Sequence, residues 1–326
     1  MILITGAAGF IGYHTSKKFL ENKMKVVGVD NINNYYSKKL KLDRIKNLKK
    51  SKFKNYFKFY KVDITDEKRM EKIFKKEKIK FVIHLAAQAG VRYSLVNPNS
   101  YTKNNLLGTS TILELSRKYK IKDLYLASTS SVYGLNKKYP FSENLNTDRP
   151  GQYYAATKKS NEVMAFSYSH LFKLRSTVFR FFTVYGPWGR PDMALFKFTN
   201  NMIKRKPIPV FNYGNHVRDF TYVEDVANIL FKVFKKKKNY NFNIFNIGNN
   251  KPVNLKVYIK EIEKNLNIKS KKKLLPLQTG DVYKTFSDSN KLYKFIKYKP
   301  KTDVKYGIKE FVKWYINYFN IKKNAS

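Results

Sequence analysis

The 326-residue sequence contains no cysteine. It can therefore form no disulfide bond, and it has neither a thiol nucleophile nor a thiolate ligand for a metal. Its four histidines, His14, His84, His170 and His216, lack the mutual spacing of metal ligands, and we expect His84 to be packed at the end of a strand. The sequence thus predicts no metal site.

Long apolar segments are also missing. No run of about 18 apolar residues occurs, so we expect no membrane-spanning helix and no membrane partner. The sequence opens directly on a strand-like apolar segment, which leaves no room for a signal peptide. We therefore expect a soluble, cytoplasmic protein.

Acidic residues are scarce, with 23 Asp and Glu against 66 Lys and Arg, and the net charge is +43. A charge of this size is compatible with nucleic-acid binding. However, the lysines are spread along the whole chain, no nucleic-acid-binding motif is present, and Asn, Ile, Tyr and Phe are abundant, as AT-rich coding would produce. We interpret the charge as compositional and expect no nucleic-acid partner, although it would attract an anionic substrate.

What the first 182 residues do contain is an alternation of strand-like and helical segments. The expected strands are residues 2–4, 25–29, 57–62, 81–85, 124–128 and 176–181. The expected helices are residues 10–21, 66–76, 100–119 and 154–172. This alternation predicts an α/β fold with a Rossmann-type, doubly wound parallel sheet.

The pattern becomes irregular after residue 182, which indicates a second, smaller unit. We predict a dinucleotide-binding domain over 1–182, to which residues 222–248 return with a helix and a strand. Residues 183–221 and 249–326 would form the smaller C-terminal, substrate-binding domain. Further helices are expected at 194–204, 257–266 and 305–319.

A glycine-rich loop follows the first strand, with Gly6, Gly9 and Gly12 three residues apart. Glycines at this point allow a tight turn and close approach of the backbone to a pyrophosphate at the helix N-terminus. Asp30 follows the second strand, where a carboxylate can accept hydrogen bonds from ribose hydroxyls and would repel a 2′-phosphate. The sequence favours NAD over NADP, with a solvated turn as the alternative reading of Asp30.

Tyr154 and Lys158 are four residues apart on a predicted helix and so share one face. The pattern arises by chance in a chain rich in Tyr and Lys, but a hydroxyl cluster, residues 128–131, ends an earlier strand. A free tyrosine has a pKa of ~10, and a base near neutral pH needs it lowered by roughly 3 units. A neighbouring ammonium and a cationic nicotinamide could supply this shift.

These motifs resemble the extended short-chain dehydrogenase/reductases, specifically the nucleotide-sugar epimerases, and the resemblance runs nearly end to end. Two long segments, residues 86–94 and 180–194, are similar to UDP-glucuronate 4-epimerases. The resemblance implies that Tyr154 is the base and that Lys158 lowers the pKa of Tyr154 and binds the nicotinamide ribose. It implies that Thr129 helps to relay the proton. The implied cofactor-binding residues are Gly6, Gly9, Phe10, Ile11, Gly12, Asp30, Asn31, Asp63, Ile64, Leu85, Ala86, Ala87, Asn104, Tyr154 and Lys158. The implied substrate-binding residues are Arg92, Thr129, Ser130, Ser131, Thr183, Arg190, Phe211, Arg218 and Asp281.

The resemblance implies NAD-dependent epimerisation at C4 of a UDP-sugar, most simply UDP-glucuronate to UDP-galacturonate through a 4-keto intermediate, in polysaccharide biosynthesis. Ser131 stands where related dehydratases and decarboxylases carry Glu, and Thr183 and Gln278 differ from UDP-galactose epimerases. The alternatives are a 4-epimerase of another UDP-hexose or of an N-acetylated UDP-sugar, and a basic nucleic-acid-binding protein on a relict Rossmann fold. The helices at 100–119 and 154–172 are the pair that the resemblance places in a homodimer interface.

Overall fold

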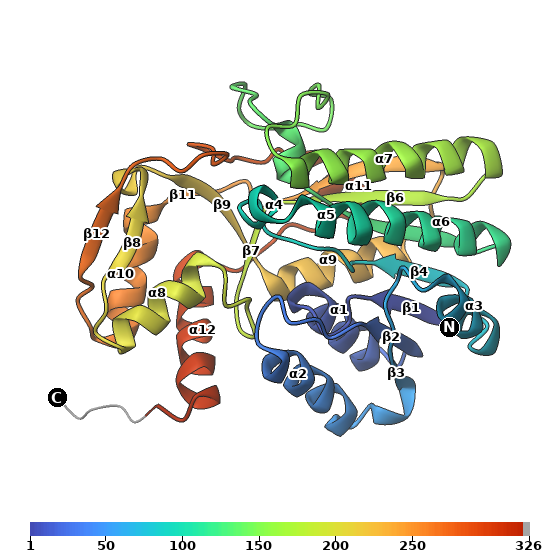
Figure 1. Cartoon of the computed structure of the whole chain (residues 1–326), viewed down its shortest axis with the longest axis horizontal. Coiled ribbons are helices and arrows are strands. Elements are labelled where there is room, and N and C mark those ends of the chain that lie inside the picture. Colours follow the sequence, from blue (N-terminus) through green and yellow to red (C-terminus); the bar gives the residue numbers. More distant parts are fainter. Residues whose placement is uncertain (322–326) are drawn as a thin grey trace.

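The computed structural model describes residues 1–321. Its centre is a seven-stranded sheet in which every pair of neighbouring strands is parallel (Figure 1). The strands, in spatial order, are β10 (Phe242–Ile247), β6 (Ser176–Phe181), β5 (Asp123–Thr129), β4 (Phe81–His84), β1 (Ile2–Thr5), β2 (Val26–Asp30) and β3 (Phe57–Lys61). The order reverses direction beside β1, so the expected doubly wound Rossmann-type sheet is confirmed.

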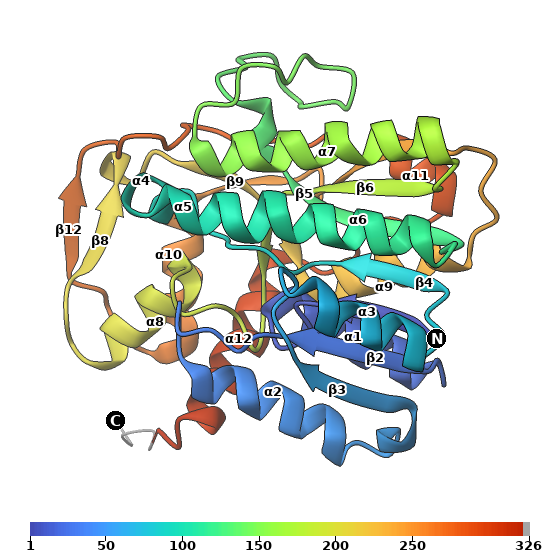
Figure 2. The same cartoon turned by 45° about the vertical axis from the view of Figure 1, so that its right-hand side comes forward.

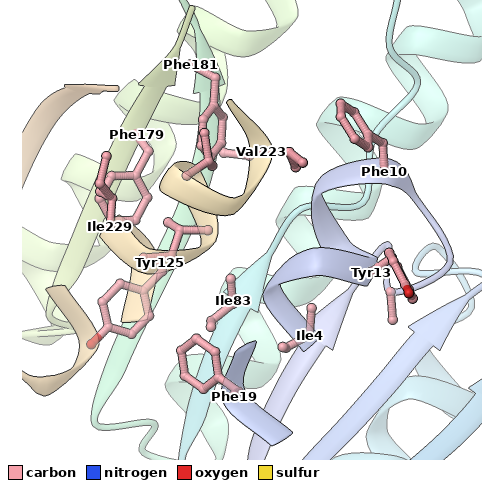
Figure 3. Packing of buried hydrophobic residues seen from close by; sticks show 14 of the residues in the cluster. Ile4, Phe10, Tyr13, Phe19, Ile83, Tyr125, Phe179, Phe181, Val223 and Ile229 are labelled. Atoms are coloured by element: carbon pink, nitrogen blue, oxygen red, sulfur yellow. The ribbon is translucent and has the colours of Figure 1, made fainter. Parts of the chain in front are cut away.

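Helices cover both faces of this sheet. One apolar cluster joins the sheet to α1 (Phe10–Glu21), α2 (Lys38–Lys50), α9 (Val223–Lys235) and α11 (Asn290–Ile296). A second cluster on the other face joins it to α3 (Glu67–Lys76), α6 (Gly108–Lys118) and α7 (Tyr153–Phe172). Because both faces are covered, the inner strands are buried along nearly their whole length rather than at alternate residues. Figure 3 shows Tyr125, Phe179 and Phe181 of the sheet near Val223 and Ile229 of α9, and Ile4 and Ile83 near Phe19 of α1.

The helix expected at 100–119 is present but not regular. It consists of α5 (Pro98–Tyr101), a π-helical segment at Thr102–Leu107 and α6. Within the π segment, the buried Asn105 accepts from Gln88 N at 2.8 Å and donates to Gln88 O and Thr157 Oγ1 at 3.1 and 3.0 Å. One wide turn of this kind often marks a functional site, and here it joins the loop after β4 to α7.

The smaller C-terminal part contains two short sheets and a third apolar core. Its strands are β7 (Thr183–Tyr185), β9 (Val217–Tyr222) and β11 (Pro252–Asn254) in one sheet, and β8 (Ile208–Phe211) and β12 (Lys272–Leu275) in the other. Its helices are α8 (Ala194–Ile203), α10 (Leu255–Leu266) and α12 (Val304–Tyr318). The division into domains stays a prediction, but β10 does join the large sheet beside β6.

Short 3-10 turns occur at Lys54–Tyr56, Ser130–Tyr133 and Asn212–Gly214, and α4 (Tyr93–Val96) is a single turn. In the part of the chain that the structure describes, no helix combines the length and apolarity needed to cross a membrane.

Candidate active site

A cavity of about 420 Å³ lies at the carboxyl ends of the central strands and is also lined by the C-terminal part. Doubly wound folds bind their ligands at this edge of the sheet. The predicted site residues that line the cavity are Gly6, Gly9, Phe10, Ile11, Gly12, Asp30, Asn31, Ile64, Leu85, Ala86, Ala87, Asn104, Thr129, Ser130, Ser131, Tyr154, Lys158, Thr183, Arg190, Arg218 and Asp281. Asp63, Arg92 and Phe211 are not among the lining residues.

The glycine loop packs too closely to carry side chains. A Cβ at Gly6, where φ is +71°, would lie 2.8 Å from Ala86 N, and a Cβ at Gly12 would lie 2.0 Å from Gly6 O. The first turn of α1 has no side-chain cap and no acidic residue. Its backbone N–H groups are therefore available to an anion, which fits the pyrophosphate of a dinucleotide.

Asp30 is the last residue of β2 and lines the cavity beside this loop. Its carboxylate accepts from Ala8 N at 3.2 Å and from Ile32 N at 2.9 Å, and burial raises its pKa. Asp63 contributes indirectly: it accepts from Asn31 Nδ2 at 2.9 Å and from Thr65, so it orients a residue that lines the cavity. A carboxylate has about four acceptor positions, so Asp30 retains capacity for ribose hydroxyls.

The end of β5 and the start of α7 bring the three candidate catalytic residues together. Thr129 is the last residue of β5 and accepts from Ser131 N at 3.2 Å. Tyr154 and Lys158 are one helical turn apart on α7, and Lys158 Nζ donates to Ala127 O at 2.8 Å. All three line the cavity.

The ionisation of Tyr154 differs in one respect from the sequence expectation. Burial raises the pKa of Tyr154 despite the opposing effects of the Arg190 cation and of hydrogen bonding with Thr129. Burial lowers the pKa of Lys158 to about 8, and Glu162 opposes that shift. Among the chain's own groups, Arg190, rather than Lys158, is the cation that most favours the Tyr154 phenolate. The sequence could not indicate this, because Arg190 comes from a loop 36 residues further along the chain.

Hydroxyl groups and one guanidinium form the part of the cavity next to Tyr154. Ser130, Ser131 and Thr183 line it together with Arg190. The Arg190 side chain donates from Nε to Asp192 Oδ1 at 3.0 Å and from Nη2 to Asp192 Oδ2. Asp192 raises the pKa of Arg190 against the effect of burial, so the guanidinium remains charged. A fixed cation beside several hydroxyl donors is suited to a carboxylate.

The residues that the family resemblance implies for binding the UDP part of the substrate form one cluster. Arg218 Nη2 donates to Asp281 Oδ1 at 2.8 Å, and Arg92 Nη2 lies 3.6 Å from Asp281 Oδ2. The Arg92 guanidinium lies over the Phe211 ring, 5.1 Å from its centroid. Arg92 and Phe211 therefore contact each other at the edge of the cavity while Arg218 and Asp281 line it.

Sequence reasoning missed several lining residues that follow β2, namely Asn33, Tyr35, Tyr36 and Lys41. Lys41 is buried and donates to Asn33 O and to Asn33 Oδ1. Their position after β2 could have indicated that they line the cavity, because the carboxyl ends of parallel strands face the same crevice.

Comparison with known proteins agrees with this geometry. A model of the NAD dependent epimerase/dehydratase family matches residues 2–248. UDP-glucuronate 4-epimerase 4 of Arabidopsis thaliana is 41% identical over 341 residues, covering 100% of this chain and 77% of the relative.

Two solved structures are similar over nearly the whole chain. One is UDP-glucuronic acid 4-epimerase from Bacillus cereus in complex with UDP-glucuronic acid and NAD, with a TM-score of 0.92 and 32% identity, covering 97% of this chain and 99% of that one. The other is UDP-glucose 4-epimerase from Thermotoga maritima with UDP-glucose, with a TM-score of 0.87 and 31% identity, covering 98% of this chain and 99% of that one.

Proposed function

The chain belongs to the NAD dependent epimerase/dehydratase family, and we propose that it interconverts UDP-glucuronate and UDP-galacturonate by epimerisation at C4. One observation carries the proposal: Tyr154, Lys158 and Thr129 share a cavity with three further hydroxyl residues and a cation, namely Ser130, Ser131, Thr183 and Arg190. The first group suits proton transfer at a sugar hydroxyl, and the second suits the acid of a uronate.

The side chains of the protein would transfer one proton and would hold the sugar and NAD in place. The Tyr154 phenolate takes the proton of the sugar 4-hydroxyl, with Thr129 hydrogen-bonded to the same oxygen, as C4 loses hydride and becomes a ketone. Bound NAD would supply the hydride acceptor, and the positive charge of its nicotinamide would add to the stabilisation of the phenolate. The ketone would rotate within the cavity so that the opposite face of C4 is reduced, and Tyr154 would return the proton to the oxygen.

Lys158 would hold the nicotinamide ribose from its buried position on α7. Its Nζ is already oriented by Ala127 O, so little freedom is lost when a hydroxyl is bound. The glycine loop and the uncapped N-terminus of α1 would bind the pyrophosphate, and Asp30 the adenosine ribose. These groups fit NAD, and because the oxidised form is regenerated in every cycle, we expect it to remain bound during purification.

The carboxylate cluster would also protect the intermediate. A 4-keto uronate is a β-keto acid and loses carbon dioxide easily when its carboxylate is free to align with the ketone. Arg190, held by Asp192, and the hydroxyls of Ser130, Ser131 and Thr183 would fix the carboxylate in one orientation. None of the three hydroxyl residues carries a charge that would repel it.

A 4-epimerase of another UDP-hexose remains the second candidate, because the two similar structures differ by only 1% in identity (32% against 31%). Two observations favour the uronate. The chain is 41% identical to a UDP-glucuronate 4-epimerase, and Arg190, paired with Asp192, places a cation in the cavity. A nucleic-acid-binding protein on a relict fold is less favoured, since such a protein has no need for Tyr154, Lys158 and Thr129 at a single cavity.

The test is incubation of the purified protein with UDP-glucuronate without added cofactor. We expect UDP-galacturonate to form up to a constant ratio of the two epimers, and UDP-glucose to react much more slowly. Conversion of UDP-glucose alone would replace the uronate with a hexose, and no conversion of either sugar by NAD-loaded protein would contradict the proposal.

We also propose that residues 1–182 and 222–248 bind the dinucleotide while 183–221 and 249–326 bind the nucleotide sugar, and that the protein is a homodimer. The helices α6 and α7 lie side by side in both views, on one outer surface of the molecule (Figures 1 and 2). Around them, Leu107, Val163, Phe166 and Leu171 are each more than half exposed, at 54%, 54%, 54% and 63%. Pairing this surface with its two-fold copy would bury these side chains.

A further inference from the structure

Arg44 is a fully buried cation that joins distant parts of the chain. It lies on α2, is 0% exposed, and donates from Nη1 to Ala8 O at 2.8 Å and to the Tyr36 hydroxyl at 2.7 Å. Its Nη2 donates to Trp188 O and to Gly189 O, the latter at 3.2 Å. One guanidinium therefore contacts both the glycine loop and the loop that precedes Arg190.

That second loop has an unusual backbone. Trp188 has a φ of +62°, which costs free energy in a bulky residue and persists only where surroundings enforce it. His14 of α1 hydrogen-bonds to Pro187 O at 2.9 Å, while Arg44 binds the next two carbonyl oxygens. Three successive carbonyl groups are thus held by side chains from α1 and α2.

The segment that leads into α2 also holds Arg190 in place. Its ion-pair partner Asp192 accepts a hydrogen bond from the Tyr35 hydroxyl at 3.2 Å. Tyr35 lies in the connection between β2 and α2, next to the Tyr36 that contacts Arg44. The backbone before Arg190 and the carboxylate that orients its guanidinium are therefore both fixed by residues 35–44.

We infer that Tyr35 and Arg44 are positioning residues that set the orientation of Arg190 and so determine selectivity for a sugar acid. This inference rests on the proposed function, in which Arg190 binds the substrate carboxylate. Neither residue is a catalytic group. Tyr35 acts on Arg190 through Asp192, and Arg44 acts through the loop backbone and, through Ala8, on the dinucleotide loop as well.

The two residues should differ in what they control. Loss of the Tyr35 hydroxyl removes one of the groups that hold Asp192, which Arg190 still binds, and should change acid recognition without lowering NAD retention. A lysine at position 44 carries one ammonium that cannot reach four separated acceptors. Arg44→Lys should therefore lower NAD retention and acid selectivity together.

The main experiment compares Tyr35→Phe with Tyr318→Phe. Each change removes one phenolic hydroxyl that donates to an aspartate. The Tyr318 hydroxyl contacts Asp43 on α2, and Tyr318→Phe keeps the ring that packs against Trp188 with 5.2 Å between centroids. Binding of UDP-glucuronate and UDP-glucose is measured by calorimetry on NAD-loaded protein in a Tyr154→Phe background, so that the sugars are not turned over. We expect Tyr35→Phe to lower the affinity ratio for the acid by about tenfold, the scale of one hydrogen bond to a charged group. Tyr318→Phe should leave the ratio unchanged.

A double-mutant cycle identifies the route of the effect. In an Arg190→Ala background, Tyr35→Phe should no longer change the affinity ratio, because the group on which it acts is missing. An equal loss for both sugars, or an effect that persists without Arg190, would overturn the inference and make Tyr35 a general structural residue.

Arg44→Lys is tested by the NAD content of purified protein, with circular dichroism as the check on folding. Normal NAD content and normal selectivity in a folded variant would overturn the role of Arg44, and failure to fold leaves the Tyr35 comparison to decide.

If wild-type protein binds UDP-glucose as tightly as UDP-glucuronate, the proposed substrate is wrong, an outcome separate from the result for Tyr35.

Discussion

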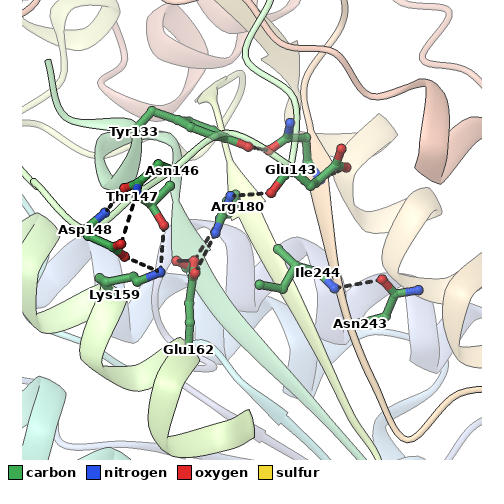
Figure 4. A network of polar contacts seen from close by, with 12 residues as sticks. Tyr133, Glu143, Asn146, Thr147, Asp148, Lys159, Glu162, Arg180, Asn243 and Ile244 are labelled. Carbon is green, nitrogen blue, oxygen red and sulfur yellow. Dashed lines mark hydrogen bonds and ion pairs between the residues drawn. The ribbon is translucent and has the colours of Figure 1, made fainter. Parts of the chain in front are cut away.

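Arg180 of β6 donates to both carboxylate oxygens of Glu162 on α7, at 3.0 and 2.8 Å, and each residue is 2% exposed (Figure 4). Ser128 donates to the same carboxylate, and the Arg180 guanidinium lies 5.0 Å from the centroid of the Tyr133 ring. Glu162 is one helical turn beyond Lys158, and Ser128 directly precedes Thr129. The pair therefore fixes the helix and the strand that carry the candidate catalytic residues.

Glu162→Gln should destabilise the protein by roughly 3–5 kcal/mol, because it leaves the buried Arg180 charge without its partner. Urea unfolding measures the loss. Glu21→Gln, at an exposed pair with Lys17, is the control and should cost less than about 1 kcal/mol. A similarly small loss for Glu162→Gln would show that water reaches Arg180.

Tyr154→Phe should retain the fold and bound NAD but lower turnover of UDP-glucuronate by at least about 10²-fold, the usual scale for a lost acid-base group. Initial rates and the NAD content of the same preparation are measured together. Near-normal turnover would remove Tyr154 from the role of base.

Arg190→Ala should reduce kcat/KM for UDP-glucuronate roughly tenfold to a hundredfold, since a hydrogen bond to a charged group contributes roughly 1.5–3 kcal/mol. UDP-glucose has no carboxylate and should lose less, because only the stabilisation that Arg190 gives to the Tyr154 phenolate is removed. Equal losses for the two sugars would mean that Arg190 acts only on Tyr154 or on its own loop and does not bind the carboxylate.

Acid should destabilise the protein before its carboxylates titrate. Burial lowers the pKa of His14 and of His84 to about 3 in the folded chain, whereas an unfolded histidine titrates near ~6.5. The unfolded state then binds more protons below pH ~6.5, so stability falls with pH by about 1.4 kcal/mol per unit for each histidine.

Urea unfolding between pH ~7 and ~5 measures this slope, a window in which ordinary carboxyl groups stay ionised. His84→Gln should reduce the slope of stability against pH by about 1.4 kcal/mol per unit, the contribution of one histidine. A free energy of unfolding that does not change over this range would contradict the prediction.

Phe166→Asp should convert the proposed dimer to a monomer, because it places a charge on the exposed side of α7, where the Phe166 ring also borders Phe242 of β10. Light scattering at micromolar concentration gives the mass. Tyr306→Asp is the control, since Tyr306 is 57% exposed on α12, close to the 54% of Phe166. A monomeric wild-type protein would exclude the dimer.

The sequence was sufficient for the sheet and for most of the cavity because both depend on local signals. The alternation of apolar strands and amphipathic helices fixes a doubly wound sheet, and the carboxyl ends of its strands then meet at one edge. Gly6, Asp30 and Thr129 each lie at such an end, so their convergence on one cavity could be predicted.

Residues whose role depends on distant partners could not be recognised in this way. Arg44 belongs to a strongly basic helix and looks solvated in the sequence, but its acceptors include backbone oxygens 144 and 145 residues away. The π-helical turn at Thr102–Leu107 depends on contacts of Asn105 with Gln88 and Thr157, which no local pattern encodes.

The order of the strands along the chain also has a consequence during synthesis. Six strands of the large sheet are complete at Phe181, but β6 then has an open edge, and Tyr125 and Phe179 lack the cover of α9. An open edge next to exposed aromatic side chains promotes aggregation. The ribosome must make 66 further residues, to Ile247, before β10 closes that edge, and at ~5–20 residues per second the nascent chain is vulnerable for several seconds.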